Sequence, residues 1–282
     1  MSGDEKMEAY EKKLRETTSI PTQQISGSGR VHIEGIGEVH IAGSGFISPE
    51  EIRISGSGSL PGGLKVQKIR GAGAVSIGGD IEAEDIDFSG EASVKGNIIT
   101  RTLIASGSLI VHGQVRGELV KGAGSCRVEK GIDLKDALRA SGSLTVLGDV
   151  KATNAVSLNG KFDIEGKITT TDFEAKLSRS ESHVSEGVQA VNVDVKKKRA
   201  EGMVILGVPI LRRLFRYEGR LHTTDITAKE TVNIENVSCE NVQGKNVTVG
   251  KGCVVNRRIR YSNSISVDPG AKTANPPEKI RE

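Results

Sequence analysis

Aromatic side chains are almost absent from this sequence. Its 282 residues contain no Trp, three Tyr and five Phe, so aromatics make up only 3% of the chain. Any core must therefore be built from Val, Ile and Leu without large aromatic anchors. The 35 glycines are in turn unusually many. This composition favours stacked short strands joined at glycine corners.

Cysteine is also scarce, and no long apolar run occurs. The three cysteines, Cys126, Cys239 and Cys253, are odd in number and form no CxxC pair, which predicts free thiols in a reducing cytoplasm. No stretch of 18 apolar residues occurs, and residues 1–18 lack an apolar leader segment. We therefore expect neither secretion nor a transmembrane span.

No large excess of one charge is present. The chain has 39 basic and 36 acidic residues, which leaves a net charge of +3. A near balance argues against a chain-wide nucleic-acid surface, because such surfaces are strongly basic. We therefore expect no nucleic-acid partner.

The sequence motifs of nucleotide, metal and catalytic sites are missing as well. There is no GxxxxGK[ST] motif, and no GxG step completes GxGxxG before a helical pattern. None of the five histidines has HxxxH spacing or lies in a Cys/His cluster, so we expect no metal site. The acidic segment 80–88 is expected to be a solvated strand face. We accordingly expect no catalytic, cofactor-binding or metal-binding residues, and no enzyme.

What the chain does contain is a repeated phrase with a glycine corner. The corners span 133 residues in eight steps, a mean of about 17 residues, which indicates stacked structural units. The predicted corner residues are Gly27, Gly43, Gly56, Gly71, Gly90, Gly107, Gly124, Gly142 and Gly160.

The segments between the corner glycines alternate apolar and polar residues, as in "SLTVLGDV" and "SLIVHGQV". This alternation is typical of β-strands with one buried face. About 17 residues at roughly 3.3 Å each give a path of about 55 Å, enough for three short strands. Because NG and DG hairpin signals are missing at half this spacing, we expect no antiparallel meander. The prediction is an all-β parallel β-helix with about 17–18 residues per lap, where a lap is one circuit of the coil.

The pattern is interrupted and then resumes. In the later block Val247 and Ile265, like Val249 and Val267, are one lap apart, so the lap length is kept. The expected divisions are a charged tail or short helix (1–19), a first β-helix block (20–177), an irregular lap plus a basic and apolar insertion (178–218), a second block (219–270) and a C-terminal tail (271–282).

The insertion admits two interpretations. One is a short helix that begins at Pro209 and covers an end or side of the coil. The other is a membrane-surface segment, since seven basic and three acidic residues between 194 and 218 accompany an apolar face. The candidate membrane or partner contacts are Lys196, Lys197, Lys198, Arg199, Leu211, Arg212, Arg213, Leu214, Phe215 and Arg216.

The phrases "GSLIVHGQVRGEL" (107–119) and "SGSLTVLGDVKATNAVSLNGKFDIEGKI" (141–168) resemble the bactofilins, bacterial polymer-forming cytoskeletal proteins. The block 218–267 looks like the C-terminal part of longer relatives in Gram-positive bacteria. This resemblance, over roughly residues 25–268, implies a right-handed triangular β-helix. It also implies end-to-end assembly without nucleotide into a cytoplasmic scaffold, often at the inner face of the membrane.

Two other functions remain as alternatives. A monomeric β-helical adhesin-like or partner-binding module would use the same coil without assembling. A left-handed β-helix acyltransferase is suggested by "VTVGKGCVV" (247–255), which resembles the hexapeptide repeat of those enzymes. A true hexapeptide chain repeats that signal every six residues, whereas here it recurs about once per lap.

Overall fold

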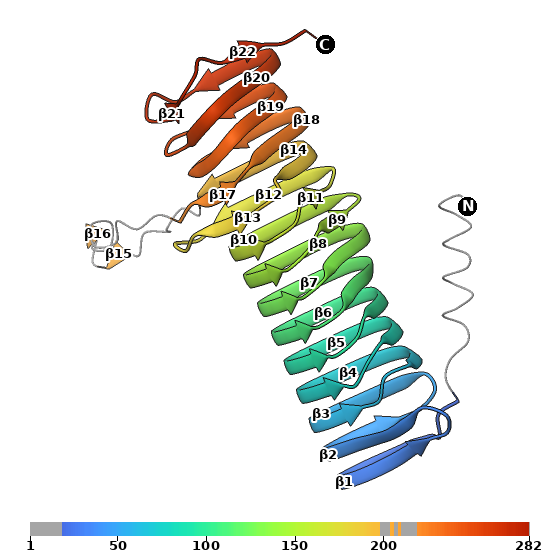
Figure 1. Cartoon of the computed structure of the whole chain (residues 1–282). Coiled ribbons are helices and arrows are strands. Elements are labelled where there is room, and N and C mark those ends of the chain that lie inside the picture. Colours follow the sequence, from blue (N-terminus) through green and yellow to red (C-terminus); the bar gives the residue numbers. More distant parts are fainter. Residues whose placement is uncertain (1–18, 198–203, 206–207, 210–218, 282) are drawn as a thin grey trace. The chain divides into compact units, whose positions relative to one another are not determined.

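The computed structural model describes residues 19–197, 204–205, 208–209 and 219–281, and every regular element among them is a β-strand (Figure 1). The chain forms two compact units, unit 1 (Met1–Ala152) and unit 2 (Thr153–Glu282). The all-β prediction is confirmed for these ranges. The N-terminal helix expected within residues 1–19 falls almost wholly outside them. Nothing in the described part of the chain is a helix of sufficient length and apolarity to cross a membrane.

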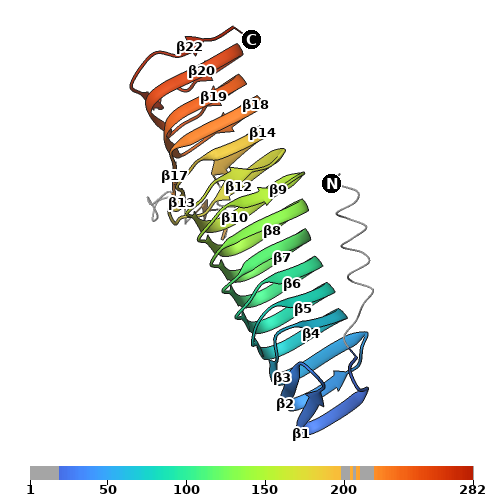
Figure 2. The ribbon, with the colours of Figure 1, turned by 45° about the vertical axis from the view of Figure 1, so that its right-hand side comes forward.

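The described part of unit 1, residues 19–152, contains nine strands. They are β1 (Gln23–Ile33), β2 (Gly37–Ile47), β3 (Glu51–Leu60), β4 (Leu64–Ile77), β5 (Ile81–Val94), β6 (Ile98–Val111), β7 (Gln114–Val128), β8 (Gly131–Val146) and β9 (Val150–Ala152). The long strands bend at a glycine, so each one supplies two sides of a lap. Figure 2 shows β4 to β8 stacked one upon the next.

From β3 to β8 the strands pair in parallel, and each lap lies in register with the next. One buried column runs through Ile52, Ile69, Ile86, Leu103, Val120 and Leu138. Alternate residues point inward, as the period-2 pattern predicts. The unit is thus a β-solenoid, and its core is a stack of aliphatic side chains.

The glycine corners form a second column, with one correction. Gly56, Gly73, Gly90, Gly107 and Gly124 pair in succession. The prediction that Gly71 is a corner residue is wrong. The backbone φ is positive at Gly73 instead, which lies midway between Gly56 and Gly90, so the laps on its two sides are equal in length. Gly71 is buried opposite Phe88, and a side chain there would collide with Val75 and the Phe88 ring. The other eight predicted corners all have positive φ.

The start of unit 1 differs from the parallel prediction. β1 pairs with β2, and β2 with β3, in antiparallel fashion. The first turn is three residues long and contains Gly35 at φ +72°, a hairpin geometry that needs no NG pair. The second turn is held by Ser48, whose Oγ accepts hydrogen bonds from the backbone N–H groups of Glu50 and Glu51. The prediction of parallel strands is based on the absence of NG and DG pairs, which mark two-residue turns. Neither the three-residue turn at Gly35 nor the turn held by Ser48 contains such a pair, so the absence of NG and DG does not exclude antiparallel pairing here.

Unit 2 is also a β-solenoid. Its strands are β10 (Ala155–Ile164), β11 (Ile168–Thr169), β12 (Asp172–Leu177), β13 (Ser182–Val184), β14 (Val188–Lys197), β17 (Leu221–Thr223), β18 (Asp225–Ile234), β19 (Val237–Val249), β20 (Val254–Val267), β21 (Lys272–Thr273) and β22 (Glu278–Lys279). Two short strands inside the insertion, β15 (Val204–Ile205) and β16 (Val208–Pro209), pair with each other in antiparallel fashion.

The laps of unit 2 vary in length but keep one core. β10, β12, β14, β18, β19 and β20 pair in parallel succession. Val247 pairs with Ile265 and Val249 with Val267, as their spacing in the sequence predicts. The insertion follows β14 directly, and β18 then pairs with β14 as the next lap. The long excursion is therefore accommodated with a register shift of one residue between β14 and β18, at Ala190–Asn192.

Candidate functional site

The last lap of unit 2 has an open edge. On one side β20 pairs with β19 along most of its length. On its other side β21 pairs with Val254 and Val255, and β22 pairs with Arg260 and Tyr261. Within the described ranges, no strand pairs with the outer side of residues 264–267. We call this segment the open leg.

The apolar core reaches the surface at the open leg. Val247 and Val249 are 1% and 0% exposed, but their partners on β20 are less covered. Ile265 is half-buried, and Val267 is 38% exposed. An unpaired strand edge beside exposed apolar side chains is a template for another strand.

Two other parts of β20 are covered by the C-terminal segment. Ile280 N–H donates to the Tyr261 carbonyl at 2.8 Å, and Asn275 Nδ2 donates to the Arg257 carbonyl at 2.7 Å. The Arg260 side chain lies 3.7 Å from Glu278. Residues 271–281, expected as a tail, therefore form a partial cover that stops short of the open leg.

The first strand of unit 1 also has a free edge, but a different surface. Among the described residues, β1 pairs only with β2. Its apolar side chains Ile25, Val31 and Ile33 are all 5% exposed or less. This edge offers backbone groups without an exposed apolar residue, whereas the open leg combines an unpaired edge with the exposed Val267.

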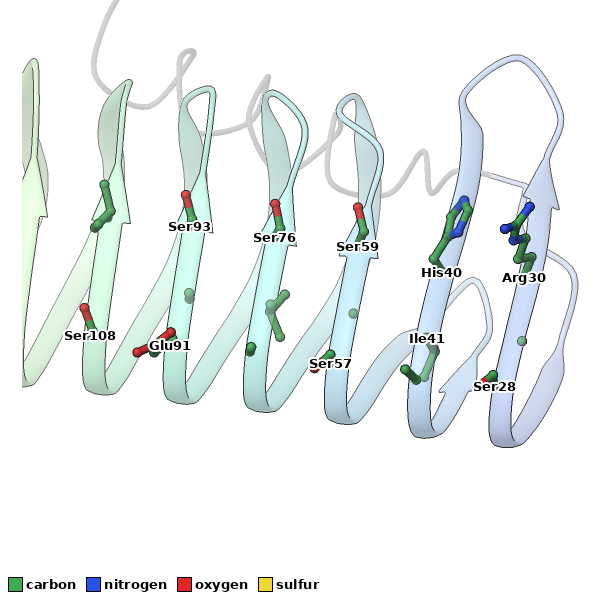
Figure 3. Close-up of a pocket in the computed structure, with 17 residues that line it drawn as sticks. Ser28, Arg30, His40, Ile41, Ser57, Ser59, Ser76, Glu91, Ser93 and Ser108 are labelled. Carbon is green, nitrogen blue, oxygen red and sulfur yellow. The ribbon is translucent and has the colours of Figure 1, made fainter.

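A groove of about 980 Å³ crosses the outer face of unit 1 from β1 to β6. Ser59, Ser76 and Ser93 follow one another along it on successive strands (Figure 3). The titratable residues in its lining are Arg30, His40 and Glu91, and His40 is engaged by Glu38 at 3.1 Å. Small side chains make up much of the lining, and more of its surface is apolar than polar. His40 and Ser59 are register partners within it.

The predicted membrane contacts fall mostly outside the described residues. Lys198, Arg199, Leu211, Arg212, Arg213, Leu214, Phe215 and Arg216 all do so. Of the two that are described, Lys196 forms a 2.6 Å ion pair with Asp194, and this hydrogen bond raises the Lys196 pKa. The Lys197 backbone N–H donates to Glu235 at 3.5 Å. Lys196 is therefore already paired on the strand that precedes the insertion.

The acidic segment 80–88 is engaged by neighbouring laps. Asp80 Oδ1 accepts hydrogen bonds from the Asn97 backbone N–H and side chain. Glu82 lies 3.3 Å from Lys65, and Asp85 lies 2.7 Å from Arg101. These carboxylates hold successive laps together and do not converge on a common point.

All three cysteines are free thiols and buried. Burial raises the pKa of Cys126 and Cys253, and it raises the pKa of Cys239 to about 12. Because the thiolate is the reactive form, these thiols are poor nucleophiles in the folded chain.

The structure brings together two histidines that sequence spacing separates. His183 on β13 and His222 on β17 are register partners, and their rings stack with centroids 5.1 Å apart. Glu181 lies beside them, with Oε2 3.9 Å from His222 Nε2. Burial lowers the pKa of His222, and the charge of Glu181 opposes that shift. In the sequence, the similarity of "SHV" (182–184) to "LHT" (221–223) could have predicted that these two strands are neighbours. The insertion between them makes their separation much longer than one lap, so the lap spacing does not reveal the pair.

No protein-family model, curated protein or solved structure matches this chain significantly.

Proposed function

We propose that this protein is a non-enzymatic structural scaffold that assembles end to end into a nucleotide-independent polymer of the bactofilin type. The observation that carries the proposal is the open leg of unit 2, where the strand edge at residues 264–267 and the Val267 side chain lack cover among the described residues. The occupant is a second copy of this chain, because a solenoid lap is the natural complement of another solenoid lap.

The resemblance of residues 107–119 and 141–168 to bactofilins supplies the finer features of the proposal. These are a right-handed, triangular coil and a cytoplasmic location at the inner face of the membrane. The basic and apolar insertion would provide a second contact, with an anionic membrane surface. No nucleic-acid partner and no cofactor enter the proposal, in keeping with the balanced charge.

The energetics make assembly sensitive to small changes at the open leg. Burying about 300–600 Å² of apolar surface at a joint gives roughly 8–15 kcal/mol. Association costs about 4–15 kcal/mol in lost freedom. Since the two ranges overlap, a single charged residue within the joint is enough to shift the balance toward monomers.

Electron microscopy of the purified full chain, without nucleotide, tests the proposal. We expect filaments from the wild type at tens of micromolar concentration. Val267→Glu should abolish them, because it places a charge in the joint. Ser266→Glu adds the same charge to the neighbouring exposed residue, which faces away from the core column, and should assemble. Dispersed wild-type monomers, or equal assembly by the two variants, would contradict the proposal.

The groove on unit 1 favours the monomeric partner-binding module as the second candidate function. A row of small polar residues along successive strands suits an extended partner. Wild-type protein that stays monomeric in the same experiment would leave this candidate in place of the polymer.

A further inference from the structure

We propose that Glu181, His183 and His222 form a binding site for a divalent transition-metal ion of the zinc class, located where the chain re-enters unit 2 after the insertion. One potential ligand atom from each residue lies within 4.8 Å of the other two. The site is independent of the proposed scaffold function, since it lies away from the open leg in sequence and register.

The solenoid itself creates the pair of histidines. β13 and β17 are neighbouring strands (Figure 1). They pair in parallel, with Ser182 opposite Leu221 and Val184 opposite Thr223. Ser182 and Leu221 are fully buried, so the next residue on each strand points to the outer face. The stacked rings of His183 and His222 follow from this register.

A neighbouring carboxylate orients the His183 ring. Its Nδ1 lies 3.1 Å from Asp163 Oδ1 on β10, the preceding lap, and Asp163 is itself paired with Lys161. A carboxylate on Nδ1 holds the proton there and leaves the lone pair on Nε2. This is the arrangement that orients metal-binding histidines in known sites.

His222 supplies an independent indication of a ligand. Although 37% of its side chain is exposed, its Nε2 atom is covered and has no hydrogen-bond partner among the described residues. Glu181 Oε2, at 3.9 Å, is too distant for a hydrogen bond to this nitrogen. A buried ring nitrogen without a partner is destabilising, and a metal ion between the ring and the carboxylate would satisfy it.

The donor set selects the class of ion. Two imidazole nitrogens and one carboxylate suit Zn²⁺ and its neighbours, whereas Mg²⁺ and Ca²⁺ prefer oxygen ligands. Ligands about 2.0–2.1 Å from a tetrahedral Zn²⁺ lie about 3.3 Å apart, so the three side chains must close by somewhat over 1 Å. The Glu181 side chain and the two stacked imidazole rings must therefore all turn toward the ion, and water would take the fourth position.

The ion would join segments that are far apart in the chain. β17 is a short strand, and the whole insertion separates it from β13, its register partner. A bound ion would fix this short strand to the lap before the insertion. The structure therefore indicates a stabilising role for the site.

Titration of the full chain with Zn²⁺, without a polyhistidine tag, tests the site by calorimetry. We expect one saturable Zn²⁺-binding site per chain and no saturable binding of Mg²⁺. His222→Gln should abolish binding at the concentration that saturates the wild type. Asp163→Asn should weaken it about 10–100-fold, because Asp163 only positions His183. Zn²⁺ should raise the thermal unfolding midpoint of the wild type but not of His222→Gln.

His112→Gln is the matched control. His112 also bonds a carboxylate of the next lap, Glu129 at 2.9 Å, but it is not part of the Glu181 cluster. Its Zn²⁺ binding should equal that of the wild type. Should His222→Gln fail to fold, Glu181→Gln, at an exposed position, should still weaken binding about tenfold or more. Absence of saturable wild-type binding, or equal losses in His112→Gln and the cluster variants, would overturn the proposal.

Discussion

At the scale of single residues, the glycine column limits which side chains the corners accept. Gly107 has φ +121°, and a Cβ there would collide with the carbonyl oxygen of Gly90 in the lap below. Gly27 has φ +91° but lies on the first strand, where a Cβ would meet no atom within 4 Å. A side chain would therefore suffer backbone strain at both positions, but it would collide with a neighbouring backbone only at Gly107.

This difference predicts unequal effects of one substitution. Gly27→Ala should lower the free energy of unfolding by about 1–2 kcal/mol, the strain of a positive φ. Gly107→Ala should lower it by more than about 3 kcal/mol, because the neighbouring lap must also move. Chemical denaturation monitored by circular dichroism measures both, with Ser106→Ala at an exposed corner position as control. Equal losses in the two glycine variants would mean that stacking does not constrain the corner.

At the scale of elements, the C-terminal segment decides how much of the last lap is available. β21 and β22 occupy the outer side of two legs of β20, each through only two register pairs. Such short strands are held weakly, so they cover the edge without sealing it. The sequence "ANPPEKIRE" (274–282) does not indicate how much of β20 these strands cover, because its two prolines suggest only where a strand ends.

Truncation after Pro269 should therefore promote assembly. Removing β21 and β22 uncovers the backbone groups of Val254, Val255, Arg260 and Tyr261, which can then pair with another copy. We expect the truncated chain to sediment as larger species at a lower concentration than the wild type. If it remains monomeric where the wild type assembles, the C-terminal segment contributes to the joint instead of covering it.

At the scale of the whole molecule, each lap contacts only its neighbours, so local stability depends on having two of them. β6 is paired on both sides, with β5 and β7. β20 has a full-length partner only in β19. A terminal lap therefore opens more easily than an interior one.

Native-state hydrogen exchange should report this difference. Backbone amides of residues 98–111 should exchange more slowly than those of residues 254–267 in the monomeric chain. Under conditions of assembly, protection should increase selectively at residues 264–267, while residues 98–111 stay unchanged. Uniform protection across both segments would contradict the account of an open terminal lap.

The sequence by itself determined the all-β solenoid, the length of its laps and eight of the nine corner glycines. Those features follow from a period-2 pattern and from glycine spacing, which are local properties of the chain. Only the tertiary structure decided the antiparallel start, the corner at Gly73, the uncovered leg at residues 264–267 and the meeting of His183 with His222. Each of these depends on the register between laps, which turn geometry and inserted segments set and which residue spacing alone does not record.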